Sequence, residues 1–529
     1  MRSTTDESPA SPARAPSRLA GLCAGAVTAC AFLFLFLPML SMGLRRGVNH
    51  DESQHLAAGA VFGRHLLLPY RDFPYFHMPD LVFVYGALFR WGGPMLLAAR
   101  MLSVEAGWLT CVLLWYIVWR ECRGKAWPAR WLLPAASVLL LLGNPLFREG
   151  YWRTWNHALA TLFGLVAVAL AMRASARIGR WFSAGIFIGL AIGTRLTFAP
   201  LFAPLAVAAA WEPARGTLRQ RLRGVWMLCA GAALSLLPAL VLFAIAPAQF
   251  IFGNFTFNST VNILFRQSYH DPRITWHAKL LYPFVTLLPN AGNWLPALLF
   301  VLFAGAALAR VFKMLPDLRY RLLLVLALIP FTLIGAVAPS PSQTEYYYAL
   351  VPLLVLAAAL SAAYFSSGRW GWICPVLLLL PGIYCTARSW DEYQRIAILK
   401  DPAAWPPILL HQAGVEAAQS IREGRRVLTL EPIFPLEGGL DIYPSLVTGN
   451  IAWRTEPFIA PGDRARLQIL GLDNLDAAME ESPPAAVLTI SPSALDGPLA
   501  AWARRHGYAP HFLQARGKLV DQPIVWTRP

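Results

Sequence analysis

Charged side chains are scarce in this sequence. Asp, Glu, Lys and Arg make up only 14% of the 529 residues, whereas 57% are hydrophobic. The apolar runs repeatedly reach about 20 residues, the length that an α-helix needs to cross the ~30 Å hydrocarbon core of a bilayer. The composition excludes an ordinary soluble globular protein and predicts a polytopic α-helical membrane protein.

The apolar runs predict about eleven transmembrane helices within residues 19–387. We place them at 19–43, 97–119, 131–146, 157–172, 181–194, 197–211, 224–246, 292–309, 322–338, 347–365 and 371–387. A Ser-, Pro- and Ala-rich tail at 1–18 precedes them and is expected to be disordered. Two connecting loops, 44–96 and 248–290, are long enough to indicate that they have a function. In the first loop we expect short helices at the outer membrane interface, with several aromatic residues at headgroup depth: Tyr70, Phe73, Tyr75, Phe76, Phe83 and Tyr85.

Cysteine is rare as well, and the seven cysteines lie in or beside the predicted helices. Residues 388–529 contain none, which excludes a disulfide framework or a cysteine-ligated zinc site in that region. The region also has no Gly-rich phosphate loop and no obvious catalytic triad. Its alternating patterns predict a small α/β domain. We expect strands near 425–432, 485–491 and 523–527 and helices near 407–423, 462–481 and 494–506.

The positive charge is unevenly distributed. A formal net charge of +16 could indicate nucleic-acid binding, but clusters of Arg and Lys recur in alternate short loops between the predicted helices. Basic loops stay on the cytoplasmic side of a membrane. The prediction is therefore a multi-pass protein of the cytoplasmic (inner) membrane, with a cytoplasmic N-terminus and no nucleic-acid partner. An odd number of helices places residues 388–529 and both long loops outside the cytoplasm.

Two adjacent carboxylates, Asp51 and Glu52, follow the first apolar run in the stretch NHDESQH at 49–55. Asn49 could cap a helix here, and the helix dipole would stabilise both acids, so a purely structural role explains them. A functional role is the alternative, because Asp51 and His55 share one helical face at i and i+4. The same loop adds further charged and titratable side chains, namely Arg71, Asp72 and His77.

The order of these segments resembles a known family. A first helix, the Asp-Glu pair and the stretch HLAAGAVFGRHLLLPYRDFPYFHMP at 55–79 are similar to the first external loop of the GT-C glycosyltransferases. The similarity is to the branch with protein O-mannosyltransferases, aminoarabinose transferases and bacterial galacturonosyltransferases. Residues 189–207 resemble the family's helix-turn-helix with a basic outer turn, and residues 339–360 resemble its late loop and helix. The resemblance covers roughly residues 19–387.

The resemblance implies an enzyme that takes a hexosyl or pentosyl group from a polyprenyl-phosphate donor. It would transfer the sugar outside the cytoplasmic membrane to an envelope glycan, such as lipopolysaccharide, to a lipid or to a protein. Asp51 matches the position of the general base that accepts the acceptor's proton, and Glu52 is its neighbour in the catalytic motif. Arg195, in the basic outer turn, is the main candidate for the donor phosphate, with an interface-snorkelling arginine as the alternative. Weaker phosphate candidates are Arg71, His77, Arg273, Lys279, Tyr346 and Tyr347.

The sequence departs from the family pattern at two places. Asn156 and His157 occupy the expected position of a second acid, and Glu149 is the only carboxylate nearby. His77 or Met78 stands where aminoarabinose transferases carry a lysine, so a fixed positive charge there is in question. The side chains that could bind the acceptor or support the site are His55, Asp72, Glu149 and Arg273.

Two local features have competing explanations. Glu105 is an acid inside a predicted helix, which indicates either a functional role or an ion pair with Arg100. The segment 265–279 is rich in His, Arg and Trp and could line an acceptor site. A solvated loop anchored by aromatic residues explains it equally well.

No obligatory metal or other cofactor is expected. Only Asp51, Glu52, Asp72 and Glu149 could gather around a divalent cation, which the resemblance allows but does not favour.

Two other classes of membrane protein remain as alternatives to a glycosyltransferase. A transporter or flippase for a lipid-linked envelope precursor would usually show repeated halves and ionisable or broken helices at mid-membrane. An O-antigen-type ligase or polymerase would be expected to use arginine-rich external loops.

Overall fold

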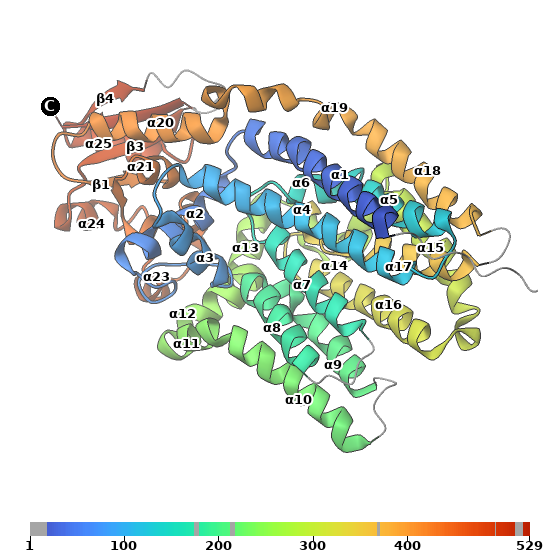
Figure 1. Cartoon of the computed structure of the whole chain (residues 1–529). Helices are drawn as coiled ribbons and strands as arrows, with labels where there is room; N and C mark the ends of the chain where they lie inside the picture. The colour runs from blue at the N-terminus through green and yellow to red at the C-terminus, as the bar shows by residue number, and fades with distance from the viewer. Residues whose placement is uncertain are drawn as a thin grey trace, which may run out of the picture.

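The computed structural model describes residues 18–173, 179–211, 217–367, 371–491, 493–513 and 522–528. The predicted tail at 1–18 lies outside these ranges except for its last residue. Figure 1 shows a long bundle of helices with a smaller region of strands and helices at one end, which contains the C-terminus.

Each of the eleven predicted segments is helical. Their counterparts are α1 (Arg18–Arg45), α4 (Met95–Glu121), α5 (Trp127–Leu142), α7 (His157–Ala171), α8 (Gly179–Thr194), η1 (Leu196–Leu201) with α9 (Phe202–Trp211), α10 (Leu218–Ser235) with α11 (Leu237–Ile245), α15 (Ala291–Leu308), α16 (Pro316–Val337), η6 (Thr344–Tyr347) with α17 (Leu350–Phe365), and α18 (Ile373–Arg388). By length and composition, five helices of the described chain can cross a membrane, or up to seven if each bent helix pair counts as one crossing. The other apolar helices are shorter, so the number of crossings stays a prediction.

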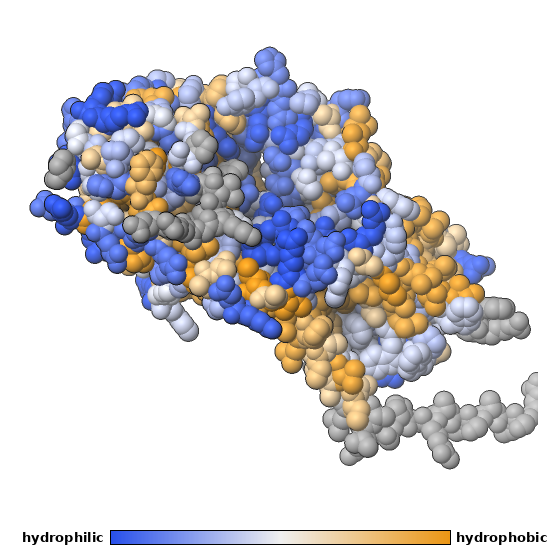
Figure 2. Space-filling model, turned by 90° about the horizontal axis from the view of Figure 1, so that it is seen from above, coloured by the Kyte–Doolittle hydropathy of each residue, from blue (hydrophilic) through white to orange (hydrophobic). Residues whose placement is uncertain are grey.

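The bundle exposes large hydrophobic side chains, as a protein in contact with lipid does. Phe34, Trp226 and Val301 are 65%, 72% and 61% exposed. In Figure 2 hydrophilic residues gather mainly at the end that carries the C-terminal strands, and hydrophobic residues are more prominent towards the other end. This distribution is that of a multi-pass membrane protein with a polar part at one end.

The loop at 44–96 contains α2 (His50–His65) and α3 (Asp80–Phe89). α2 covers the range in which the sequence predicts a helix. It begins at the cap Asn49, whose side-chain oxygen accepts a hydrogen bond from the N–H of Asp51 at 2.9 Å. The carboxylate of Glu52 accepts from the N–H of Asn49, also at 2.9 Å, which completes a capping box.

The aromatic residues of this loop do not lie at the lipid interface, which corrects the prediction. Five of the six are at most 2% exposed inside the protein, namely Tyr70, Phe73, Tyr75, Phe76 and Tyr85. Four of these five share a hydrophobic core with residues of the C-terminal region such as Val427, Leu488 and Val525. The loop is covered by protein, so its aromatic side chains serve packing.

The loop at 248–290 is helical over most of its length, and it includes two π-helices, η2 and η4. Its elements are α12 (Pro247–Ile251), η2 (Phe252–Val261), α13 (Asn262–Gln267), η3 (Pro272–Ile274), α14 (Trp276–Tyr282) and η4 (Pro283–Leu287). Short helices also lie in other connections: α6 (Pro145–Gly150), η5 (Val311–Lys313), α19 (Trp390–Tyr393), η7 (Ile396–Lys400) and η8 (Pro402–Ala404).

Residues 406–527 contain a five-stranded sheet with strand order β2-β1-β3-β5-β4. β1 pairs in parallel with β2 and β3, and β5 pairs antiparallel with β3 and β4. The strands are β1 (Arg426–Thr429), β2 (Asp441–Ile442), β3 (Ala486–Ser491), β4 (Ala509–Phe512) and β5 (Gln522–Thr527). The helices are α20 (Pro406–Gln419), α21 (Ile433–Glu437), η9 (Pro444–Leu446), α22 (Asn450–Thr455), η10 (Glu456–Phe458), α23 (Pro461–Leu467), α24 (Leu475–Glu481) and α25 (Gly497–Arg505). The three predicted strands are present, while the helix predicted at 462–481 is split because the chain turns at Gln468 with φ 56°.

The C-terminal region docks on the first loop through buried polar contacts. Glu437, at the end of α21, accepts hydrogen bonds from the N–H groups of Met95 and Leu96 at 3.1 and 2.8 Å, in the first turn of α4. Arg64 of α2 donates to two backbone carbonyls in and just after α21, at 2.6 and 2.9 Å. The C-terminal region is thereby held beside α2, the helix that carries the two adjacent acids.

Candidate active site

A cavity of about 330 Å³ lies where the first loop, the helix bundle and the C-terminal region meet. Its wall contains both charged and aromatic side chains. The lining residues are Asn49, Asp51, Gln54, His55, Phe76, His77, Arg153, Trp155, Asn156, His157, Arg195, Phe257, Asn262, Arg266, Pro341, Gln343, Glu345, Tyr346, Ile451, Arg454 and Thr455.

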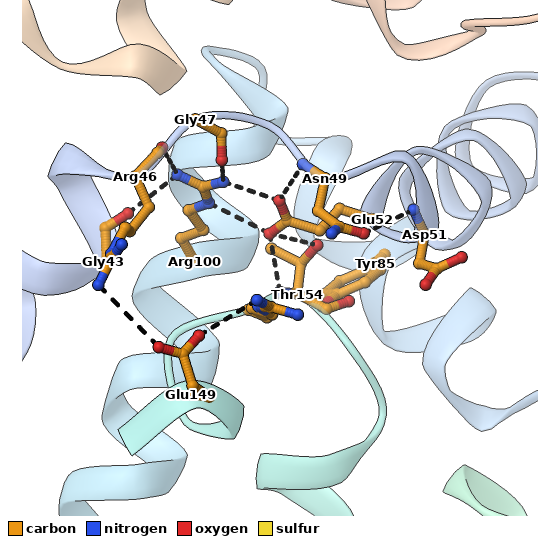
Figure 3. A network of polar contacts seen from close by, with 11 residues as sticks. Gly43, Arg46, Gly47, Asn49, Asp51, Glu52, Tyr85, Arg100, Glu149 and Thr154 are labelled. Atoms are coloured by element: carbon orange, nitrogen blue, oxygen red, sulfur yellow. Dashed lines mark hydrogen bonds and ion pairs between the residues drawn. The ribbon is translucent and has the colours of Figure 1, made fainter. Parts of the chain in front are cut away.

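Asp51 contributes a carboxylate to this cavity from the first turn of α2. Figure 3 shows its side chain directed away from Arg100. Arg454 and Glu345, two other lining residues, interact electrostatically with Asp51. Asp51 is therefore a carboxylate that a ligand in the cavity can reach.

Glu52, the next residue, faces the opposite way and is completely buried. Arg100 donates to its carboxylate through Nε and Nη2 at 3.2 and 2.7 Å, and both side chains are 0% exposed (Figure 3). Thr154 adds two more hydrogen bonds, from its N–H at 3.1 Å and its hydroxyl at 3.3 Å. Arg100 also donates to the carbonyl oxygens of Gly43, Arg46 and Gly47. Glu52 thus joins α2 to α4 and to the end of α1.

Arg195 lies at the turn between α8 and η1 and is 9% exposed. Its Nη1 donates to the side-chain oxygen of Asn156 at 2.6 Å, and its Nε donates to the hydroxyl of Thr197 at 3.0 Å. The guanidinium carbon lies 5.1 Å from the centroid of the Tyr346 ring. A guanidinium held in place at a cavity wall is suited to bind a phosphate or a carboxylate.

Three histidines line the cavity near Arg195, and burial keeps His55 and His77 neutral. The rings of His55 and His77 lie 4.7 Å apart, and Nδ1 of His55 is 3.0 Å from the hydroxyl of Tyr75. Burial and the charge of Arg195 lower the pKa of His77 to about 3. Burial, then His77 and Arg195, lower the pKa of His55 well below its usual value. At pH 7 Arg195 therefore provides the positive charge at this end of the cavity. The third histidine is His157. Both of its ring nitrogens are buried and have no hydrogen-bond partner among the described residues.

Solved structures share this architecture. The crystal structure of ArnT from Cupriavidus metallidurans bound to undecaprenyl phosphate has a TM-score of 0.58 and 13% identity, over 95% of this chain and 98% of that chain. Its apo state has a TM-score of 0.52 and 14% identity, over 96% and 98%. ArnT, an aminoarabinose transferase, is a GT-C glycosyltransferase. This chain has the GT-C fold.

The oligosaccharyltransferase of Archaeoglobus fulgidus is also similar, with a TM-score of 0.46 and 12% identity over 91% of this chain and 73% of that chain. No protein-family model and no curated protein sequence matches this chain. The fold shared with ArnT confirms the resemblance to GT-C proteins seen in the sequence.

Within this GT-C fold, five of the twelve predicted site residues line the cavity. They are Asp51, His55, His77, Arg195 and Tyr346. These residues are far apart in the sequence, and the packing of the first loop against the bundle brings them together.

Four of the other predicted residues are engaged in local ion pairs or contacts outside the cavity. Arg71 is exposed and binds its neighbour Asp72 at 2.6 Å, while Asp72 also accepts a hydrogen bond from the N–H of Leu68. Arg273 binds Asp271, two residues away, at 2.8 Å. Glu149 is likewise outside the cavity and binds Arg153, four residues away, at 3.1 Å. Each of these side chains binds a partner that is close in sequence and does not reach the cavity.

Of the remaining three predicted residues, Lys279 does not line the cavity and donates to the carbonyl of Ala338 at 3.0 Å. The other two each follow a lining residue and point elsewhere. Glu52 follows Asp51 on an α-helix, where successive side chains diverge by about 100°. Tyr347 follows Tyr346 on a 3-10 helix, where they diverge by about 120°. Tyr347 stacks on Tyr282 with ring centroids 6.0 Å apart. One member of each pair faces the cavity, and the other packs into the protein.

Both departures from the family pattern lie at the cavity, because Asn156, His157 and His77 all line its wall, and Asn156 binds Arg195. The structure also excludes one of the two explanations given for Glu105, the ion pair with Arg100. The guanidinium of Arg100 binds Glu52 and backbone carbonyls, whereas Glu105 is exposed on the surface of α4. That explanation of Glu105 is therefore wrong.

Sequence reasoning missed four charged lining residues: Arg153, Glu345, Arg266 and Arg454. The first three lie in segments that the sequence analysis already considered. A charged side chain within an aromatic external segment is the pattern by which they could have been predicted. Arg454 carries no such signal, because it lies in the C-terminal region and reaches the cavity only through tertiary docking.

The described part of the chain contains no preformed metal site. No cluster of three or more His, Cys, Asp or Glu side chains in the described ranges is arranged to hold an ion. The independence of the reaction from metals remains a prediction.

Acid stability should depend on His77. An unfolded histidine titrates near pH 6.5, whereas in the folded chain the pKa of His77 is about 3, so the unfolded state binds more protons between these values. Stability therefore falls as the pH drops through this window. We expect His77→Gln to reduce the loss of unfolding free energy between pH 6.5 and 5.5 by about 1 kcal/mol in chemical denaturation. His270→Gln, at an exposed position, is the control, and a pH dependence unchanged in His77→Gln would contradict the assignment.

Proposed function

We propose that this protein is a membrane glycosyltransferase that moves a sugar from a polyprenyl-phosphate donor to an envelope glycan, lipid or protein on the outer face of the cytoplasmic membrane. One observation carries the proposal: Asp51 and a cluster of arginines line the same cavity in a chain with the fold of ArnT. The ArnT structure contains undecaprenyl phosphate, and the proposal extends that class of ligand to this chain.

The donor phosphate binds at Arg195. The guanidinium is already oriented by Asn156 and Thr197, so little freedom is lost when it binds an anion. The neutral histidines His55 and His77 add hydrogen-bonding groups without adding charge. The face of Tyr346 closes one side of the guanidinium.

Transfer proceeds by a single displacement at the anomeric carbon. Asp51 takes the proton of the acceptor hydroxyl as its oxygen forms the new bond to that carbon. The bond between the carbon and the phosphate oxygen breaks, and the phosphate leaves with the electron pair. Arg195 stabilises the negative charge that develops on the leaving phosphate. Glu52 takes no part in the proton transfer and instead holds α2 in place through Arg100.

The small α/β domain at 388–529 completes the cavity from outside the membrane. α22 supplies Ile451, Arg454 and Thr455 to the wall. This placement gives the domain a part in binding the acceptor, and it requires that the domain and the first loop lie on the same side of the membrane.

The proposal is tested with the full chain in lipid nanodiscs and a panel of polyprenyl-phosphate sugars. We expect release of polyprenyl phosphate and transfer of the sugar to an envelope extract with at least one donor. A flippase or transporter would instead move an intact donor across a vesicle membrane without cleaving it. Intact donor after prolonged incubation with every member of the panel would overturn the enzyme assignment.

Arg195→Ala should weaken the binding of undecaprenyl phosphate by at least about tenfold, because a charge-assisted hydrogen bond contributes about 1.5–3 kcal/mol. The fold should persist, since the side chain has no carboxylate partner to leave unpaired among the described residues. Arg71→Ala removes an exposed arginine outside the cavity and should leave the affinity unchanged. Equal affinities for the wild type and Arg195→Ala would remove Arg195 from the donor site.

A further inference from the structure

Four arginines line the cavity, and they differ in their partners. Arg153 and Arg266 each have a carboxylate nearby, at 3.1 and 3.7 Å. For Arg195 and Arg454, no carboxylate oxygen of the described residues lies within 4 Å of the guanidinium. Two guanidinium groups of the cavity are therefore available to bind a ligand.

The two available arginines belong to different parts of the wall. Arg195 follows α8 and is held by Asn156 in the helix bundle. Arg454 lies on α22 in the C-terminal region, where its guanidinium carbon is 5.3 Å from the centroid of the Phe265 ring. The Nε of Arg454 is buried and has no hydrogen-bond partner among the described residues. A buried donor of this kind is stabilised when a ligand supplies an acceptor.

Arg454 lies in the electrostatic environment of the proposed general base. Burial lowers the pKa of Arg454, and the carboxylate of Asp51 is the charge that most opposes this effect. Arg266 contacts the same Phe265 ring, with its guanidinium carbon 5.6 Å from the centroid, and adds positive charge. The wall beside Asp51 therefore carries the guanidinium of Arg454 in addition to that of Arg266, whose charge is offset by Asp271.

Each of the two arginines can bind an anionic group of a different substrate. A polyprenyl-phosphate sugar is a phosphodiester with one negative charge, and under the proposed function Arg195 balances it. Arg454 is then left on the side of Asp51 from which the C-terminal region closes the cavity. With a neutral acceptor, the charge of this half-buried guanidinium is offset only by Asp51 among the groups named here, and Asp51 loses its negative charge when it takes the acceptor's proton. An acidic acceptor would supply an anion that persists through this step.

We propose that Arg454 binds an anionic group of the acceptor, a carboxylate or a phosphate, close to the hydroxyl that Asp51 deprotonates. The inference rests on the proposed function and deepens it, because it assigns the acceptor to the class of acidic glycans and phosphorylated lipids. It also gives the C-terminal region a defined role: α22 selects the acceptor by its charge. The planar guanidinium can bind either oxyanion through two parallel hydrogen bonds.

The experiment uses the full-length protein in nanodiscs of neutral phosphatidylcholine and three matched soluble probes. These are methyl β-glucoside, methyl β-glucuronide and methyl glucoside 6-phosphate, which differ only in the group at carbon 6. Binding of each probe, and of undecaprenyl phosphate, is measured for the wild type, Arg454→Ala and Arg454→Lys. Arg422→Ala, an exposed arginine of the same region, is the matched control.

We expect the wild type to bind at least one anionic probe at least tenfold more tightly than the neutral glucoside. The preference should fall below threefold in Arg454→Ala, be retained in part in Arg454→Lys, and be unchanged in Arg422→Ala. The affinity for undecaprenyl phosphate should change less than threefold in all variants. Whichever anionic probe binds more tightly identifies the carboxylate or the phosphate as the preferred group.

Two results would overturn the inference. Equal binding of the three probes by the wild type would show that the acceptor site does not select charge. A loss of undecaprenyl-phosphate affinity in Arg454→Ala as large as the loss for the anionic probe would assign Arg454 to the donor. If Arg454→Ala does not fold, Arg454→Lys and a Gln variant carry the same comparison. Failure of the wild type to bind undecaprenyl phosphate would instead count against the proposed function, and the two failures are therefore distinguishable.

Discussion

Asp51→Asn is expected to lower the turnover of a polyprenyl-phosphate sugar by about 10²- to 10⁴-fold, the usual contribution of a positioned general base. Asn has the same size as Asp, but its amide cannot take a proton from the acceptor hydroxyl. The start of α2 should be preserved, because its capping box is formed by Asn49 and Glu52. The loss should therefore appear in kcat, with binding of undecaprenyl phosphate nearly unchanged.

The matched control for this substitution is Asp72→Asn. Asp72 belongs to the same loop, but it binds Arg71 and the N–H of Leu68 outside the cavity. We expect its turnover to stay within about twofold of wild type, since it touches neither substrate. Full activity of Asp51→Asn, measured with the donor that the wild type uses, would exclude Asp51 as the base and return the acid to a role in helix capping.

Glu52→Gln should have a large effect on stability. The substitution leaves the guanidinium of Arg100 buried, at 0% exposed, without its anionic partner. Breaking a buried ion pair from one side costs about 3–5 kcal/mol. The capping box would also lose its acidic member at the start of α2. We expect a clearly lower midpoint in thermal unfolding of the purified protein, with a parallel loss of activity.

Glu149→Gln provides the comparison for Glu52→Gln. Glu149 binds Arg153 at 3.1 Å, but its side chain is 42% exposed, so the pair contributes only about 0–1 kcal/mol. A near-normal unfolding midpoint is expected for this variant. If Glu52→Gln unfolded at the wild-type midpoint but lost all activity, the structural role would be wrong and Glu52 would rejoin Asp51 as a catalytic candidate.

The two adjacent acids illustrate what sequence reasoning can reach. Because neighbouring residues of a helix diverge by about 100°, the sequence implies that only one of Asp51 and Glu52 faces an acceptor. It cannot decide the roles of the two acids by periodicity alone, and only the resemblance to a family favours Asp51. The choice depends on Arg100, which is 48 residues away and binds Glu52 from a different helix.

Helices and central strands were predictable for local reasons. Each long apolar run became a helix, and the three β-branched runs became β1, β3 and β5. β2 was missed because it is only two residues long, and β4 was missed because its sequence, which includes Pro510 and His511, has no distinct strand pattern. The aromatic residues of the first loop were misplaced because an aromatic side chain at a membrane interface and one in a protein core have the same local sequence. The difference lies in the C-terminal region that covers them.

The sequence by itself determined that the chain is a helical membrane protein with an acid pair after its first helix and a basic turn at Arg195. These properties follow from local hydropathy, charge and periodicity. Only the tertiary structure decided that Asp51 and Arg195 share a cavity, that Arg71 and Arg273 lie outside it, and that Arg454 completes it. The physical reason is that a cavity is defined by contacts between distant segments. Such contacts depend on which buried charges find partners and which apolar faces pack together.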